Sequence, residues 1–229
     1  MLRHFGDTFQ LYPAAISSRY AQSPGPSSML NIDLNPLSPL RLKKREQRRS
    51  LNSSEQTQHA TQLAHQVTRH QRFLRCKRIA CYLANDGEID PIYIIEQAWL
   101  RGKQVYLPVL DPLNNSLHFA PFEPGNPMYT NKYGIQEPAA QLAKTIRAQQ
   151  IDLMLVPLVA FDANNNRLGM GGGFYDRSLA YLNHRQYNKK PYLIGLAHEL
   201  QKTDSLPVQD WDIRMDAIAT EEKIYGEKL

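Results

Sequence analysis

The sequence has few of the features that mark membrane, secreted or zinc-ribbon proteins. Among its 229 residues there are only two cysteines, Cys76 and Cys81, and they form no CxxC pair. A disulfide framework or a cysteine-based zinc site is therefore unsupported, and we expect reduced thiols in the cytoplasm. The longest apolar run, Leu153 to Phe161, spans nine residues, whereas a transmembrane helix needs about 20. We expect no membrane span and interpret this run as a buried strand.

Excess charge is also absent from most of the chain, because the net charge of +5 comes from one segment. Between Arg41 and Arg78, eleven Lys or Arg residues stand against Glu46 and Glu55, so this segment carries +9 and the remainder −4. Such clustering indicates a local anionic partner more than a general nucleic-acid surface. The segment has only Phe73 as an aromatic for base stacking. Nucleic-acid binding remains a second hypothesis, which salt-dependent binding without ATP dependence would favour.

Residues 1–40 contain few charges and several Pro and Ser, so we interpret them as a flexible N-terminal extension before a domain at 41–229. In that domain, strand-like and helix-like patterns alternate. Helices are expected from Arg41, after an N-cap at Ser53 or Ser54, and at 91–101, 141–149 and 175–184. Strands are expected at 79–84, 105–110, 117–122, 151–156, 192–197 and 216–220. This alternation predicts an α/β fold, a three-layer αβα sandwich with a mostly parallel sheet.

A glycine-rich loop follows the longest apolar strand and opens the next helix. Its glycines are Gly169, Gly171, Gly172 and Gly173. Missing Cβ atoms let backbone N–H groups converge on phosphate, and the helix N-terminus adds partial positive charge. Arg167 and Arg177 flank the loop and could neutralise phosphate, and Asp176 could hold a divalent cation. Phe174 breaks a dinucleotide fingerprint and no Walker A sequence exists. A tight turn that needs glycine only for its shape remains an alternative.

The stretch from Phe161 to Arg177 resembles the signature of the 5-formyltetrahydrofolate cyclo-ligase family, which reads roughly FDxxGxRLGxGxGYYDR. Further matches follow in family order, at 86–90, 102–103, 107–108, 134–138 and 212–216, and the resemblance covers about residues 41–222. Three positions depart from the family. Asn165 replaces a turn glycine, although Asn tolerates left-handed backbone angles. Phe174 replaces a Tyr, and Leu37 stands where a Lys is usual, so Lys43 or Lys44 would have to supply that phosphate contact.

The resemblance implies an enzyme that uses ATP and Mg²⁺ to close 5-formyltetrahydrofolate into 5,10-methenyltetrahydrofolate. It implies catalytic roles for Arg167, Tyr175 and Asp176, and metal binding by Asp176 and Asp212. The implied ATP site comprises Arg41, Arg167, Leu168, Gly169, Met170, Gly171, Gly172, Gly173, Phe174 and Tyr175. The implied folate site comprises Leu83, Glu88, Tyr133, Met170, Gly171, Gly172, Gly173 and Phe174. We expect a monomer acting on small molecules, with no nucleic-acid or membrane partner.

The sequence also allows a different enzyme class and an interpretation of three histidines. A different enzyme of similar architecture, such as a sugar-phosphate isomerase or a CoA-transferase-like protein, would need a catalytic carboxylate or Lys and no nucleotide. The glycine loop with Asp176 and Arg177 fits that alternative less well. His59, His65 and His70 fall on a polar helix without paired carboxylates, and we interpret them as surface histidines.

Overall fold

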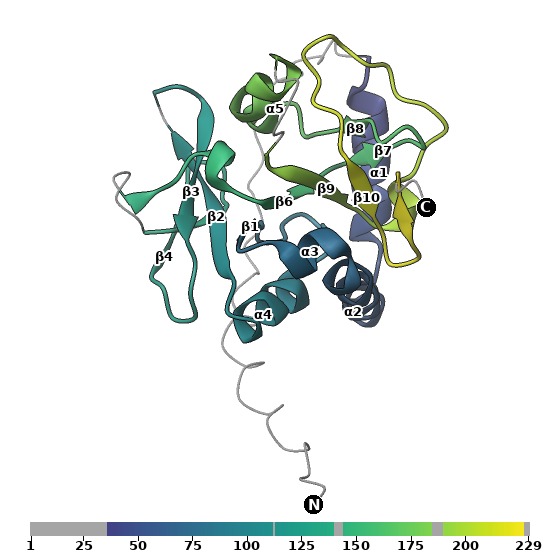
Figure 1. Ribbon diagram of the computed structural model, residues 1–229. Helices are drawn as coiled ribbons and strands as arrows, with labels where there is room; N and C mark the ends of the chain where they lie inside the picture. Colours follow the sequence, from purple (N-terminus) through teal and green to yellow (C-terminus); the bar gives the residue numbers. More distant parts are fainter. Residues whose placement is uncertain (1–35, 112, 140–143, 185–189, 227–229) are drawn as a thin grey trace, which may run out of the picture. The chain divides into compact units, whose positions relative to one another are not determined.

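The computed structural model describes residues 36–111, 113–139, 144–184 and 190–226 (Figure 1). Within these residues a seven-stranded sheet has the order β11-β10-β9-β6-β1-β2-β3. Its strands are β1 (Arg78–Ala80), β2 (Gln104–Asp111), β3 (Ser116–Pro121), β6 (Leu153–Pro157), β9 (Tyr192–Leu196), β10 (Ala217–Ala219) and β11 (Ile224–Tyr225). The five central strands run parallel, and only β3 and β11, at the edges, are antiparallel. The predicted mostly parallel sheet is confirmed.

The helices are α1 (Ser38–Arg49), α2 (Ser53–Arg69), α3 (Gln71–Arg75), α4 (Ile92–Leu100) and α5 (Phe174–Leu179). Short 3₁₀ turns are η2 (Ala148–Gln150), η3 (Ala180–His184) and η4 (Glu199–Gln201). Two small antiparallel ribbons complete the described fold, β4 (Met128–Thr130) with β5 (Gln136–Pro138) and β7 (Ala160–Phe161) with β8 (Arg167–Leu168). Most of the expected extension, residues 1–35, lies outside the described residues. No helix among the described residues is long and apolar enough to cross a membrane.

Each face of the sheet buries its own core. Successive residues of a strand point to opposite faces, so Leu155 and Met154 on β6 belong to different clusters. The first core cluster packs Leu155 against α2, α3 and α4, which lie below the sheet in Figure 1. The second packs Met154 against Leu179 of α5 and Leu182 of η3, above the sheet. Helix, sheet and helix therefore form the three layers that the sequence predicts.

The N-terminus of α2 is held by a capping box, but not by the predicted residue. Asn52, rather than Ser53 or Ser54, is the N-cap. Its side-chain oxygen accepts hydrogen bonds from the backbone N–H groups of Ser54 and Glu55, and the Glu55 carboxylate accepts one from the Asn52 N–H. Three backbone N–H groups at the start of α2 gain acceptors in this way.

The helix predicted at 141–149 is wrong over the part that the structure describes. Residues 141–143 lie outside the described ranges. Ile146 instead forms an antiparallel bridge with Phe119 of β3, through hydrogen bonds of 2.9 and 2.8 Å. Ala148–Gln150 makes a 3₁₀ turn, and Lys144 is also 3₁₀, so none of the described residues of this range is α-helical. The half-buried Ile146 packs against the second core cluster, so tertiary pairing overrides local helix propensity here.

The chain changes direction at the boundary between β1 and β6. These strands are neighbours, yet β1 leads through α4 to β2 on one side, and β6 leads through α5 to β9 on the other. Connections that diverge in this way leave a crevice at the carboxyl ends of the two strands. Ligands of open α/β sheets bind at such a switch point. The fold therefore favours a ligand-binding site at the loops that follow β1 and β6.

Candidate active site

The glycine loop, residues 169–173, joins β8 to α5 above the β6 side of this switch point. Gly171 and Gly173 have φ angles of 99° and 64°, in the left-handed region that side chains disfavour. A Cβ at position 173 would also lie 2.8 Å from Nη1 of Arg177. The loop therefore needs glycine for its backbone shape at these two positions.

Two arginines contact the loop backbone. Arg41 on α1 donates from Nε to the Gly169 carbonyl at 2.9 Å. Arg177 on α5 donates to the carbonyls of Gly172, at 2.6 Å, and Asn115, at 2.7 Å, and its guanidinium lies 5.1 Å from the centre of the Phe174 ring. The structure thus brings Arg41 to the loop, as predicted. Arg177 holds the loop through hydrogen bonds to these carbonyls. Its N–H donors are therefore less available for binding phosphate than the sequence indicated.

Arg167 and Asp176 form an ion pair at the end of the loop. Nη2 of Arg167 lies 2.7 Å from Oδ1 of Asp176, and the Arg167 side chain is 6% exposed. The Nε of Arg167 is buried without a hydrogen-bond partner among the described residues. A guanidinium donor left in this state is costly unless a ligand accepts its hydrogen bond. An anionic ligand at the loop would supply such an acceptor.

Asp176 contacts Ile213, the residue that follows Asp212 in the segment between β9 and β10. The backbone N–H of Ile213 donates to Oδ1 of Asp176 at 3.3 Å, and Oδ2 of Asp212 accepts from the Gln209 N–H at 2.9 Å. Both side chains offer hard carboxylate oxygens, and Mg²⁺ is commonly held by one or two carboxylates together with substrate phosphates. The donor set at this end of the loop fits Mg²⁺.

The loop after β1 is built on an arginine cluster, Arg45, Arg48 and Arg49, which surrounds Asp86. Arg45 and Arg48 bond to the Asp86 carboxylate at 2.7 and 2.9 Å, and Arg49 bonds to its other oxygen. Burial acts to raise the pKa of Asp86, but the hydrogen bonds from Arg45 and Arg49 outweigh it and lower the pKa. The sequence alone does not predict this role, because no local pattern links Arg48 to a residue far along the chain. Three of the eleven basic residues of the segment are therefore paired with a carboxylate of the same protein.

Glu88 follows Asp86 in this loop and is mostly buried. Its Oε1 lies 3.7 Å from Nη2 of the fully buried Arg48, and its Oε2 accepts from the Asn85 N–H at 3.2 Å. Burial raises the pKa of Glu88 to about 7, although Arg48 and the Asn85 N–H oppose the shift. The carboxyl group can therefore change its protonation state near neutral pH.

Tyr175 connects the two loops. Burial raises the pKa of its phenol, the Glu88 carboxylate raises it further, and Arg167 lowers it, so Tyr175 lies near both charged groups. The ring of Phe174 meets that of Tyr133 edge-on, with centroids 5.7 Å apart. Contacts thus connect the glycine loop and its flanking residues to Arg41 and Tyr133, and Tyr175 brings them near Glu88.

The remaining predicted residues have different surroundings. Met170 is exposed on the glycine loop, and Leu83 is half-buried against the first core cluster. Leu168 is buried in a small cluster that also contains Leu37. Trp211, next to Asp212, is 67% exposed and was not singled out from the sequence.

The three departures from the family pattern are accommodated differently. Asn165 has φ 62°, so it takes the left-handed turn as expected. Leu37 makes an apolar contact with the cluster around Leu168. Lys44 does not replace the missing Lys at the loop, because its ammonium donates to the carbonyls of Leu200 and Lys202, both at 2.7 Å. That part of the expectation is wrong for Lys44, and Lys43 is exposed on α1.

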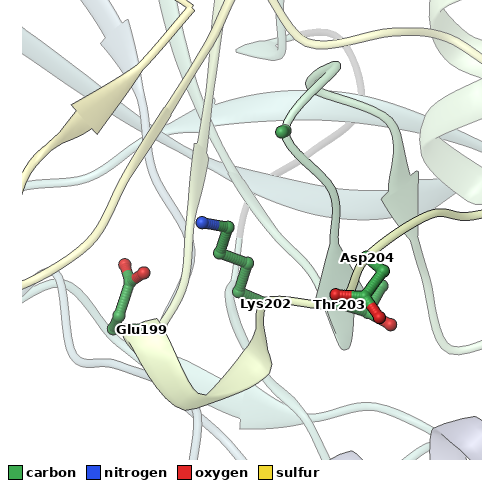
Figure 2. Close-up of a pocket in the computed structure, with 5 residues that line it drawn as sticks. Glu199, Lys202, Thr203 and Asp204 are labelled. Carbon is green, nitrogen blue, oxygen red and sulfur yellow. The ribbon is translucent and has the colours of Figure 1, made fainter.

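A separate pocket of about 540 Å³ lies beside η4 and the turn between β7 and β8. In Figure 2 the Lys202 side chain extends between Glu199 on one side and Thr203 and Asp204 on the other. Glu199 already accepts a hydrogen bond from Thr220 at 2.9 Å, and Lys202 lies over the Tyr225 ring. This pocket contains none of the residues predicted for ATP, folate or metal.

The sequence model of the 5-formyltetrahydrofolate cyclo-ligase family matches residues 37–221. The chain belongs to this family. It is 37% identical over 182 residues to the 5-formyltetrahydrofolate cyclo-ligase of Escherichia coli, covering 79% of this chain and 98% of that one. The Haemophilus influenzae cyclo-ligase is 40% identical over 159 residues, which are 69% of this chain and 79% of that protein.

A solved structure gives the same assignment. The 5,10-methenyltetrahydrofolate synthetase of Aquifex aeolicus superposes with a TM-score of 0.69 at 27% identity, covering 84% of this chain and 95% of that one. These matches confirm the family predicted from the glycine loop. They also confirm the prediction that the protein is an enzyme.

Proposed function

We propose that this cyclo-ligase family member uses ATP and Mg²⁺ to convert 5-formyltetrahydrofolate into 5,10-methenyltetrahydrofolate, releasing ADP and phosphate. Family membership supports the reaction class. The observation that carries the proposal is the meeting of the glycine loop with the Glu88 loop at the switch point, with Tyr175 near both Glu88 and Arg167. A phosphate-binding loop and a folate-binding carboxylate would then face one crevice.

The glycine loop and its arginines would hold the triphosphate. Phosphoryl transfer needs positioning and charge neutralisation more than covalent help from the protein. The loop offers backbone N–H groups, and Arg41 lies against its first glycine. Arg167 presents a buried Nε that has no acceptor among the residues that the structure describes. Asp176 and Asp212 would hold Mg²⁺, which neutralises charge on the transferred phosphoryl group.

The Glu88 side of the crevice would orient the folate. The Glu88 carboxylate accepts N–H donors of the pterin, and the exposed Tyr133 ring, supported edge-on by Phe174, stacks on it. Leu83 and Met170 add apolar contact. The formyl oxygen takes the phosphoryl group from ATP, N10 then attacks the formyl carbon and loses its proton, and phosphate departs with that oxygen. These steps leave the methenyl bridge between N5 and N10.

The decisive experiment mixes the full chain with 5-formyltetrahydrofolate, ATP and Mg²⁺ and follows the absorbance of the methenyl product. We expect product only in the complete mixture, and none without ATP or without Mg²⁺. Asp176→Asn should abolish turnover with an unchanged circular dichroism spectrum, while Asp204→Asn, in the separate pocket, should leave turnover near wild type. Product formed without ATP, or near-normal turnover of Asp176→Asn, would contradict the proposal.

The proposal includes a cytoplasmic monomer that acts on small molecules and does not bind nucleic acid. Cys76 and Cys81 are buried free thiols, which suits a reducing compartment. Arg45 and Arg48 are engaged by Asp86, which removes them from a nucleic-acid surface. Binding of duplex DNA whose log affinity falls linearly with log salt would count against this part.

A further inference from the structure

Two histidines and a glutamate from three separate elements meet at the carboxyl edge of the sheet. His59 lies on α2, His198 follows β9, and Glu221 follows β10. Nδ1 of His59 is 2.9 Å from Nδ1 of His198 and 3.5 Å from Oε1 of Glu221. One ligand atom from each residue lies within 4.8 Å of the others. The interpretation of His59 as a surface histidine without a paired carboxylate is therefore wrong.

The cluster is largely withdrawn from water. His198 is fully buried, and the side chains of His59 and Glu221 are 20% and 9% exposed. His65, on the same helix, is exposed, as the sequence predicted for all three histidines, whereas His70 is buried. The three side chains thus form a mostly buried cluster that is most open to solvent at His59.

The surroundings of His198 determine which ring nitrogen is free. Its Nε2 lies 3.3 Å from the carbonyl oxygen of Gly87, which can only accept, so Nε2 carries the proton. Nδ1 therefore presents a lone pair toward His59 and Glu221. Histidines that bind metal commonly donate their other N–H to a backbone carbonyl, which fixes the tautomer and the ring.

The carboxylate of Glu221 is oriented in a similar way. The backbone N–H of Glu199 donates to both of its oxygens, at 3.1 and 3.0 Å. Arg48, whose charge acts on His198, is paired with Asp86 and lies 3.7 Å from Glu88. A negative oxygen ligand and a neutral imidazole are therefore held in place by outer hydrogen bonds.

We propose that His59, His198 and Glu221 form a binding site for a zinc-class transition metal. Two imidazole nitrogens and one carboxylate, with a water in the fourth position, are an established ligand set of zinc sites that keep one open position. Ligands of a tetrahedral zinc ion, each about 2.0 Å from the metal, lie roughly 3.3 Å apart. The 2.9 and 3.5 Å separations bracket that value. The bound ion would tie α2 to the chain segments that follow β9 and β10.

This site differs chemically from the Asp176–Asp212 pair, which offers only oxygen ligands. Nitrogen ligands favour zinc and cobalt over Mg²⁺, whereas carboxylates and phosphates suit Mg²⁺. Saturating Mg²⁺ should therefore leave the histidine site available. The proposal does not depend on the reaction assigned to the protein.

The test uses the untagged full chain, stripped with a chelator and then held in excess Mg²⁺. Zn²⁺ is titrated by calorimetry, and Co²⁺ by its visible absorption, which is intense for tetrahedral coordination. We expect one Zn²⁺ per chain, a tetrahedral Co²⁺ spectrum and a higher melting temperature with Zn²⁺. His59→Ala and Glu221→Gln, which change the less buried ligands, should each weaken Zn²⁺ binding at least tenfold and abolish the rise in melting temperature. His65→Ala is the matched control on the same helix and should behave as wild type.

A hydrogen-bonded histidine pair without metal is the competing explanation. It predicts no stoichiometric Zn²⁺ binding to the wild type, and that outcome would overturn the proposal. Equal Zn²⁺ affinity of wild type and His59→Ala would overturn it too, because the metal would then bind elsewhere. If His59→Ala fails to fold, the Glu221→Gln titration decides in the same way.

Discussion

Replacing Glu88 by Gln tests two properties of this residue separately: its effect on the pH dependence of protein stability and its proposed contact with folate. Glu88 is held close to Arg48 in a largely buried loop, and its pKa is raised from 4.5 to about 7 by burial. Gln has nearly the same shape but cannot ionise. Arg48 keeps its hydrogen bonds to Asp86 in the variant, so no buried charge is left unpaired.

The sign of the effect follows from proton linkage. Because the folded protein binds the Glu88 proton more tightly than the unfolded chain, the stability from this group is present below pH 4.5 and is lost as pH rises through about 7. With these two pKa values, the wild type loses about 2.5 kcal/mol of unfolding free energy from Glu88 between pH 5 and pH 8. Glu88→Gln does not incur this loss. The variant should therefore gain stability relative to wild type as pH rises.

Urea denaturation of both proteins at pH 5, 6, 7 and 8 measures this difference. The matched control is Glu46→Gln, at an exposed position of α1. The difference between Glu88→Gln and wild type should grow with pH, while that for Glu46→Gln should stay nearly constant. In turnover assays at pH 8, Glu88→Gln should raise the KM for folate far more than the KM for ATP. A stability difference independent of pH would refute the burial argument, and equal effects on both KM values would refute the role as pterin anchor.

Three further predictions concern the cap, the loop and the aromatic contact. Asn52→Ala should lower the unfolding free energy by about 1 kcal/mol in urea denaturation, because two backbone N–H groups of α2 lose their acceptor. Gly173→Ala should raise the KM for ATP, since its left-handed angle costs roughly 1–2 kcal/mol and its Cβ would contact Arg177; an unchanged KM would contradict the loop assignment. Tyr133→Ala should raise the KM for folate and leave that for ATP nearly unchanged, as measured by initial rates.

Much of the fold was predictable because its signals are local. The apolar run that contains β6 is buried, as expected, and the alternation of strands and helices correctly indicated a mostly parallel sheet between helical layers. The prediction failed at Ile146, where pairing with Phe119 decides the conformation. It also placed the N-cap of α2 at Ser53 or Ser54, although Asn52 makes the capping hydrogen bonds.

The candidate site was only partly predictable. The glycine positions, Arg167 and Asp176 lie close together in the chain, so their pattern identified the loop and the family. Neither the brace made by Arg177 nor the burial of Arg48 has a local signal, because both depend on partners that fold against them. The roles of the predicted site residues as ATP, folate and metal ligands remain predictions that the proposed assays test.

The sequence by itself determined six strands of the main sheet, the family and the backbone shape of the loop, because periodicity and glycine act over a few residues. The tertiary structure alone decided that β1 lies beside β6, that their connections diverge, and that Glu88 lies near Tyr175. It also decided that His59 meets His198 and Glu221. Strand order and side-chain meetings of this kind depend on non-local packing of the whole core, which no short segment of the sequence encodes.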